Sequence, residues 1–183
     1  MTKNYKSKQP GIPYFLTFTI VEWINVFTKP EYCHILWDSL QYCRKEKGMK
    51  LYAFVFMTNH IHIIISARKE ETPLWHIIRD FKKFTAQKII QRMRKEENRD
   101  WILQLMKASG EKNGANTQYQ FWIQDDGAIE ISSEKFFHQK INYLHHNPVR
   151  AQIVLQPEDY ARSSARLYKK DDRKFLDALS EIF

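Results

Sequence analysis

The chain has 183 residues, 43% of them hydrophobic and 27% charged, a composition that fits one folded domain and excludes wholesale disorder. The sequence has no apolar run near the roughly 20 residues that a membrane span needs, and no apolar N-terminal stretch typical of a signal peptide, so we expect a cytoplasmic protein. The net charge of +8 and the 14% of aromatic residues suit a nucleic-acid partner, although a basic balance also serves solubility alone.

The first part of the chain predicts a strand, a helix and a β-hairpin. Aromatic and β-branched residues alternate over 13–23, which is typical of a strand. A helix is predicted from Pro30, a first-turn proline, to Gly48. Apolar runs over 50–57 and 60–66, separated by a short turn, predict two strands at the centre of a sheet.

The two cysteines, Cys33 and Cys43, fall in that helix. Ten helical residues separate them by about 15 Å, which is too far for a disulfide. Their spacing is also unlike that of a zinc site. We expect two reduced, structural thiols.

The second part predicts two more helices and a fourth strand. A long helix is expected over 72–97, capped by its first threonine and followed by a proline at the first position. The polar segment 108–118 predicts a loop, and 119–124 predicts a strand. A helix over 132–146 should end at the Asn-Pro pair that follows, since the residue before a proline avoids helical geometry.

The element order β-α-β-β-α-β, with a hairpin between the middle strands, predicts an α+β, ferredoxin-like sandwich with an antiparallel sheet and helices on one face. We expect a single domain over 1–183, with a core of about 13–155 and a C-terminal extension of about 156–183.

Two histidines interrupt the third predicted strand. Side chains alternate along a strand, so His60 and His62 project from the same face, about 6 to 7 Å apart. Two neutral imidazoles at this distance can ligate one divalent cation. The alternative is a pair of packing histidines that bond to backbone groups at the end of a sheet.

A second group of polar residues lies in the helix predicted near the C-terminal end. Tyr143 and Asn147 are four residues apart on one helix face, and Lys140 lies one turn earlier. Alternatively, Tyr143 is a half-buried packing residue and Asn147 a turn residue at the end of the helix. A metal bound by two imidazoles and one oxygen could polarise a phosphodiester that a tyrosine then attacks.

The segments FMTNHIHIII and INYLHHNPVRAQIV, about 80 residues apart, resemble the two signature blocks of the single-tyrosine HUH transposases and their REP-associated (RAYT) relatives. The segments YFLTFTIVEWINVF and DFKKFTAQKI extend the resemblance over about 13–168. NPVRA is closer to the REP-associated branch than to the compact insertion-sequence enzymes. Thr58 departs from the family pattern, which usually has proline there.

The resemblance implies an HUH transposase-like fold and a metal-dependent transposase that nicks and rejoins single-stranded DNA near hairpins through a 5′-phosphotyrosine. It implies that Tyr143 is the nucleophile and that His60, His62 and Asn147 bind Mg²⁺ or Mn²⁺. Both a monomer and a homodimer remain open. Two other functions also remain open: a non-catalytic nucleic-acid-binding protein on the same fold, and a plain metal-dependent phosphoesterase in which Tyr143 is structural.

DNA binding would come from basic side chains, each of which could instead be a solvated surface charge. The expected DNA-binding residues are Arg79, Lys82, Lys83, Lys140, Arg150, Arg162 and Arg166.

Overall fold

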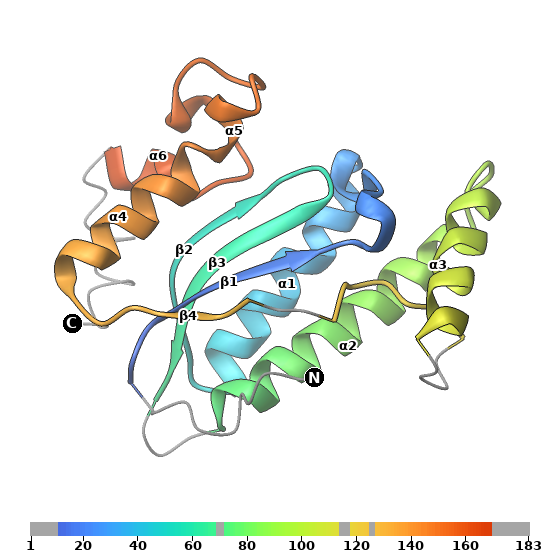
Figure 1. Ribbon diagram of the computed structural model, residues 1–183, viewed down its shortest axis with the longest axis horizontal. Coiled ribbons are helices and arrows are strands. Elements are labelled where there is room, and N and C mark those ends of the chain that lie inside the picture. Colours follow the sequence, from blue (N-terminus) through green and yellow to red (C-terminus); the bar gives the residue numbers. More distant parts are fainter. Residues whose placement is uncertain (1–10, 69–71, 114–117, 125–126, 170–183) are drawn as a thin grey trace.

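A four-stranded antiparallel sheet lies at the centre of the computed structural model, which describes residues 11–68, 72–113, 118–124 and 127–169 (Figure 1). The strand order is β2-β3-β1-β4. The strands are β1 (Tyr14–Thr19), β2 (Met49–Phe56), β3 (His60–Ala67) and β4 (Ile129–Glu130). This antiparallel order confirms the predicted ferredoxin-like α+β fold.

Helices cover both faces of the sheet (Figure 1). The α-helices are α1 (Pro30–Glu46), α2 (Leu74–Met93), α3 (Asp100–Lys112), α4 (Glu134–His145), α5 (Asn147–Arg150) and α6 (Ala165–Lys169), and the 3-10 turns are η2 (Val21–Trp23), η3 (Val26–Thr28) and η4 (Pro157–Asp159). The prediction that the helices lie on one face of the sheet holds for α1 and α2. It is wrong for α4, because the apolar stripe of this helix packs against the side chains that β1 and β3 direct to the opposite face.

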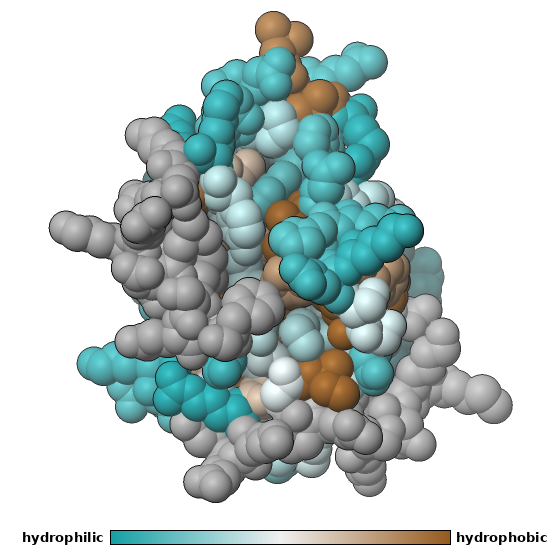
Figure 2. Space-filling view, turned by 90° about the vertical axis from the view of Figure 1, so that its left-hand side faces the viewer, coloured by the Kyte–Doolittle hydropathy of each residue, from teal (hydrophilic) through white to brown (hydrophobic). Residues whose placement is uncertain are grey.

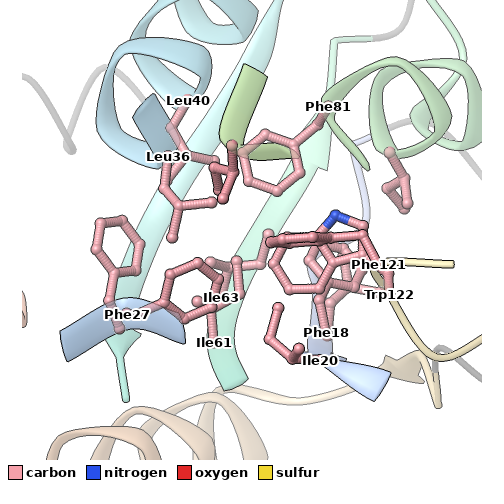
Figure 3. Close-up of a cluster of buried hydrophobic side chains, with 14 of the residues drawn as sticks. Phe18, Ile20, Phe27, Leu36, Leu40, Ile61, Ile63, Phe81, Phe121 and Trp122 are labelled. Atoms are coloured by element: carbon pink, nitrogen blue, oxygen red, sulfur yellow. The ribbon is translucent and has the colours of Figure 1, made fainter. Parts of the chain in front are cut away.

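The larger core lies between the sheet and the pair α1 and α2. Alternation along β1 and β3 directs Leu16, Phe18, Ile61 and Ile63 to this face, where each is almost fully buried. Figure 3 shows Phe18, Ile61 and Ile63 among Leu36 and other buried residues of the surrounding helices and turns. This core fixes the position of β3, which carries both histidines.

A smaller core forms on the opposite face. Phe15 and Ile64 project there from β1 and β3 and pack with Phe137, Ile141 and Leu144 of α4. The helix is seated by this apolar stripe, which recurs every three or four residues. Alternate residues of a strand project from one face, so His60 and His62 lie on the same face of β3 as Ile64 and also face α4.

The predicted fourth strand is wrong in position. The sheet edge next to β1 is formed by β4, whereas the segment 119–124 makes one isolated bridge, between Trp122 and Ile20. Two hydrogen bonds flank this bridge, from the amide of Ile123 to the carbonyl of Thr19 and from the amide of Val21 to the carbonyl of Phe121. The Trp122 indole turns towards α2, where its Nε1 donates to the carbonyl of Lys82 at 3.2 Å. Packing of this side chain holds the segment against the helix rather than in the sheet.

The helix α3 was not predicted, and the start of α2 differs from the prediction. Residues 108–112, expected in a loop, form the last turns of α3, with Gly110 inside the helix. The helix α2 begins at Leu74 because the carbonyl of Pro73 accepts its first hydrogen bonds, so Thr72 lies too early in the chain to cap it.

The segment after α5 pairs with the free edge of β2. Val55 and Ser163 form an antiparallel bridge, flanked by hydrogen bonds of 2.9 Å from the amide of Phe56 and 3.0 Å from the amide of Ser164. The hydroxyl of Tyr160 donates to the carbonyl of Phe56 at 2.7 Å. The described part of the predicted C-terminal extension is therefore packed on the sheet, and residues 170–183 lie outside the described part.

Both cysteines of α1 are free and buried, as the sequence predicts. Burial raises the pKa of the Cys33 thiol and raises that of Cys43 to about 11, which keeps both thiols protonated. Within the described part of the chain, no helix combines the length and the apolar character that crossing a membrane requires.

Candidate functional site

The two histidines of β3 lie side by side beneath α4. Their ring centroids are 4.8 Å apart, with the ring planes at 72°. His62 is 6% exposed, and His60, at the start of the strand, is partly exposed. The backbone alternation that the sequence predicts therefore brings the two imidazoles together at one end of the sheet.

Thr17 orients the His62 ring. It lies directly opposite His62 in the pairing of β1 with β3, and its hydroxyl oxygen is 2.8 Å from Nδ1 of His62. With Nδ1 paired, Nε2 is the ring nitrogen available to a ligand. Partners of this kind fix the rotation and tautomer of metal-binding histidines.

Asn59 has the same effect on His60. Its Nδ2 donates to the carbonyl of Trp23 at 3.2 Å, and its Oδ1 is 2.7 Å from Nδ1 of His60. Because a carbonyl can only accept, the amide nitrogen of Asn59 must face Trp23 and the amide oxygen must face the ring. His60 Nδ1 therefore carries the hydrogen, and Nε2 keeps its lone pair.

Burial keeps both imidazoles neutral. It lowers the pKa of His62 to about 3, and the positive charges of Arg150 and Lys140 act in the same direction, as would a charge on His60. Burial also lowers the pKa of His60, against the opposing effect of its hydrogen bond with Asn147. A neutral imidazole is the form that ligates metals.

Tyr143 is presented by α4. The helix starts at Ser133, whose side chain accepts a hydrogen bond from the amide of Phe136 at 3.2 Å. The Tyr143 ring centroid lies 5.8 Å from that of His62 and 5.8 Å from that of Phe15. Since the residue is 44% exposed, the phenol sits at the edge of the histidine pair and remains accessible from solvent.

Two cations flank this tyrosine. The guanidinium carbon of Arg150 lies 4.4 Å from the centroid of the Tyr143 ring, and the guanidinium also donates to the Tyr143 carbonyl. The ammonium of Lys140 lies 5.7 Å from the same ring and 5.0 Å from the ring of Phe15. Figure 2 shows the α4 side of the molecule, where much of the described surface is hydrophilic.

Asn147 joins the site from a different element than predicted. The helix α4 ends at His145, and Asn147 opens the short α5, so the continuous helix expected through Tyr143 and Asn147 is interrupted at His146. The Asn147 side chain nevertheless hydrogen-bonds the His60 ring. An amide and two neutral imidazoles therefore meet at one place.

These three side chains fit a divalent cation that keeps some coordination positions open for substrate or water. Two imidazoles and an amide oxygen are acceptable ligands for Mn²⁺, and for Mg²⁺ if substrate oxygens or water supply the rest. Among the described residues, no group of three His, Cys, Asp or Glu side chains is placed to hold a metal ion. A metal at this site would therefore depend on Asn147 and on oxygens from outside the chain.

The other basic residues predicted to bind DNA lie elsewhere. The helix α2, on the opposite face of the sheet, carries Arg79, Lys82 and Lys83. Arg79 is paired with Asp80, and Lys82 donates to the carbonyl of Ile123 at 3.2 Å. The structure does not bring these side chains together with Tyr143.

Two predicted DNA-binding residues of the C-terminal extension bond to the protein backbone. The guanidinium of Arg162 donates to the carbonyls of Phe27 and Thr28, and Nε of Arg166 donates to the carbonyl of Glu158 at 3.4 Å. Arg162 thereby ties the end of η3 to the edge of the sheet.

Thr17, Asn59 and Trp23 are not among the site residues predicted from the sequence. The pattern of β1 does contain a signal for Thr17. This residue is polar within an apolar strand, and it projects from the same face as Phe15 rather than from the face of the larger core. Its partner could not be identified without the register between β1 and β3.

The IS200-like transposase family model matches residues 12–107, more than half of the chain, and the chain belongs to this family. The match includes both histidines and ends before Tyr143. The family-level resemblance inferred from the sequence is thus confirmed.

Two solved structures are similar to the chain, and the first of them supports the fold. The structure of a REP-associated tyrosine transposase bound to a REP hairpin is similar with a TM-score of 0.63 at 16% identity, over 90% of this chain and 82% of the other. A Deinococcus radiodurans R1 protein described as a candidate transposase gives a TM-score of 0.47 at 16% identity, over 80% of this chain and 97% of the other. No curated protein matches the chain.

Proposed function

We propose that this transposase cleaves and rejoins single-stranded DNA near hairpins, with Tyr143 as the nucleophile. One observation carries the proposal: the Tyr143 ring from α4 lies 5.8 Å from the ring of His62 on β3, beside a second histidine. A binding protein has no need for an accessible phenol at the edge of a neutral histidine pair.

We propose that His60, His62 and Asn147 hold a Mg²⁺ or Mn²⁺ ion. Such an ion would supply positive charge to polarise the phosphodiester and to stabilise the oxyanion that develops during its cleavage. Thr17 and Asn59 contribute by holding both rings in one rotation, so that both Nε2 atoms are presented in a fixed geometry.

The phenol oxygen of Tyr143 attacks phosphorus as the bond from phosphorus to the 3′ oxygen breaks. The phenol proton is lost, the leaving 3′ oxygen gains a proton, and the 5′ end remains attached to Tyr143 as a phosphotyrosine. In the second step a 3′-hydroxyl attacks this phosphotyrosine and releases the phenol. The number of phosphodiester bonds is conserved, so rejoining needs no external energy source.

Lys140 and Arg150 bind the DNA phosphates on either side of the tyrosine in this proposal. Both are cationic, lie within 6 Å of the Tyr143 ring, and are presented on the exposed side of α4 and α5. The hairpin-bound relative supports hairpin DNA as the substrate class. The proposed site of action is the cytoplasm, and a homodimer stays a prediction.

The test is a covalent adduct assay with single-stranded hairpin DNA from the flank of the gene. We expect a protein–DNA band that resists denaturation, requires Mg²⁺ or Mn²⁺, and is lost with EDTA. The Tyr143→Phe variant should lose this band, and Tyr42→Phe, which alters an exposed tyrosine of α1, should retain it.

The other outcomes separate the alternatives. An adduct that persists in Tyr143→Phe would show that another residue is the nucleophile. Metal-dependent cleavage without an adduct would favour a plain phosphoesterase, and salt-sensitive binding without cleavage would favour a non-catalytic binding protein.

A further inference from the structure

Trp23 is an exposed aromatic residue at the edge of the candidate site. Its side chain is 61% exposed, and its ring centroid lies 6.1 Å from that of His60. The indole follows β1 in the turn η2 and lies next to β3 at the beginning of the histidine strand. A large apolar ring is thus held beside a proposed metal ligand and remains open to solvent.

The backbone beneath this ring is strained. Glu22 and Trp23 both have φ of +53°, in the left-handed region that residues other than glycine rarely adopt. The conformation is held by the Asn59 amide, which donates to the Trp23 carbonyl at 3.2 Å, and by Ser109, whose hydroxyl donates to the Glu22 carboxylate at 3.2 Å. The fold therefore stabilises a costly conformation whose result is an exposed indole.

The contacts between aromatic rings place Trp23 on the far side of the histidine pair from the proposed nucleophile. Tyr143 neighbours His62, His62 neighbours His60, and His60 neighbours Trp23, at centroid distances of 5.8, 4.8 and 6.1 Å. The nucleophile and Trp23 therefore contact opposite members of the histidine pair. In an in-line displacement the leaving oxygen departs on the side away from the nucleophile.

We propose that Trp23 stacks on the unpaired base of the nucleotide that carries the leaving 3′ oxygen. The choice of this nucleotide rests on the proposed function, in which Tyr143 is the nucleophile. Stacking on an aromatic ring suits unpaired bases and tolerates any base identity. It would hold the 3′ strand in place between cleavage and rejoining.

The proposal is tested by binding, so that cleavage is not required. Affinity is measured for a hairpin with a single-stranded flank, in which one flank nucleotide at a time is made abasic. Removal of the ring in Trp23→Gly should weaken binding about 10-fold or more, as removal of one stacked base does. At one abasic position, and only there, Trp23→Gly should bind as well as the unsubstituted protein.

Glycine separates a binding role from a structural one. Because glycine adopts a positive φ without strain, Trp23→Gly should retain or raise the melting temperature while binding falls. Trp23→Phe, which keeps an aromatic ring, should bind with intermediate affinity. Trp101→Ala removes another exposed tryptophan, 55% exposed on α3, and should leave affinity unchanged.

Three results would overturn the proposal: unchanged affinity in Trp23→Gly, an equal loss for every abasic position, or a large fall in melting temperature that accounts for the loss of binding. Failure of the tyrosine chemistry is recognised separately. In that case the abasic scan still identifies one stacked position, but no adduct forms.

Discussion

At the scale of single residues, the amide of Asn59 connects two side chains with different tasks. It accepts a hydrogen bond from His60 Nδ1 and donates to the carbonyl of Trp23. One amide therefore fixes the tautomer of a proposed metal ligand and the turn that presents an exposed indole. Thr17 contacts Nδ1 of His62 through its hydroxyl and fixes the rotation of that ring.

Replacing Thr17 by valine should weaken metal binding about 10- to 100-fold, the usual effect of losing a partner of a metal-bound histidine. Valine has a similar shape but cannot pair with Nδ1 of His62, so the ring loses its fixed rotation. Mn²⁺ titration, followed by calorimetry or electron paramagnetic resonance, measures the change.

The matched control is Thr19→Val. Thr19 lies on the same face of β1, and in the described structure its hydroxyl bonds neither histidine. Equal metal affinities for the Thr17 and Thr19 variants would show that the hydroxyl of Thr17 does not support the site.

At the scale of elements, one carboxylate joins α1 to the end of α2. Glu96 accepts a hydrogen bond from the Lys29 ammonium at 2.6 Å and one from the Tyr32 hydroxyl at 2.8 Å, and Arg99 lies 3.5 Å away. Burial opposes the ionisation of Glu96, but its hydrogen bonds with Lys29 and Tyr32 outweigh that effect and lower its pKa.

Glu96→Gln should lower the free energy of unfolding at pH 7 by about 1–3 kcal/mol, because it removes a charged acceptor from a partly buried network. A carboxyl group with a lowered pKa stabilises the fold fully above its ordinary pKa. This contribution is lost as the pH falls through the lowered value. The difference between the two proteins should therefore shrink in acid.

Urea unfolding at pH 7 and below pH 4 measures this difference. Glu97→Gln, a change of the exposed neighbouring carboxylate, is the control and should alter stability little. A pH-independent difference between Glu96→Gln and the unsubstituted protein would contradict an ionic role for Glu96.

At the scale of the whole molecule, the net charge of +8 should make DNA binding strongly dependent on salt. The question is which face carries the binding. Lys140 and Arg150 lie beside Tyr143, whereas Lys83 lies on α2 at the opposite face of the sheet.

We expect Lys140→Gln and Arg150→Gln each to weaken hairpin binding and to reduce the slope of log affinity against log salt by about one unit. Lys83→Gln should change neither if the α4 face binds DNA. Affinities measured between low and moderate salt decide the matter, and a larger effect of Lys83→Gln would assign binding to α2.

The sequence predicts the elements whose patterns are strong. Alternation identified β1, apolar runs identified β2 and β3, and the apolar stripe with the Asn-Pro pair at its end identified α4. The segment 119–124 has the composition of a strand, but Trp122 bonds to α2, a contact that no local pattern contains. The helix α3 was not predicted at all, and its last residues were expected in a loop because Gly110 and its polar neighbours resemble one.

The same limit applies to the candidate site. Spacing within one element is visible in the sequence, so His60 and His62 could be paired before the structure was known. The contact of Thr17 with His62 depends on strand register, and the contact of Arg150 with Tyr143 depends on the turn from α4 into α5. Those features arise from packing between segments far apart in the chain.

The pairing of residues 162–164 with β2 also affects how the protein behaves at high concentration. An open strand edge is a template on which a second molecule can add a strand, the first step towards aggregation. Here the backbone groups at the end of β2 are occupied by the same chain, and the opposite edge strand, β4, has only two residues, one of them the charged Glu130. Both edges of the sheet thus oppose sheet-to-sheet polymerisation.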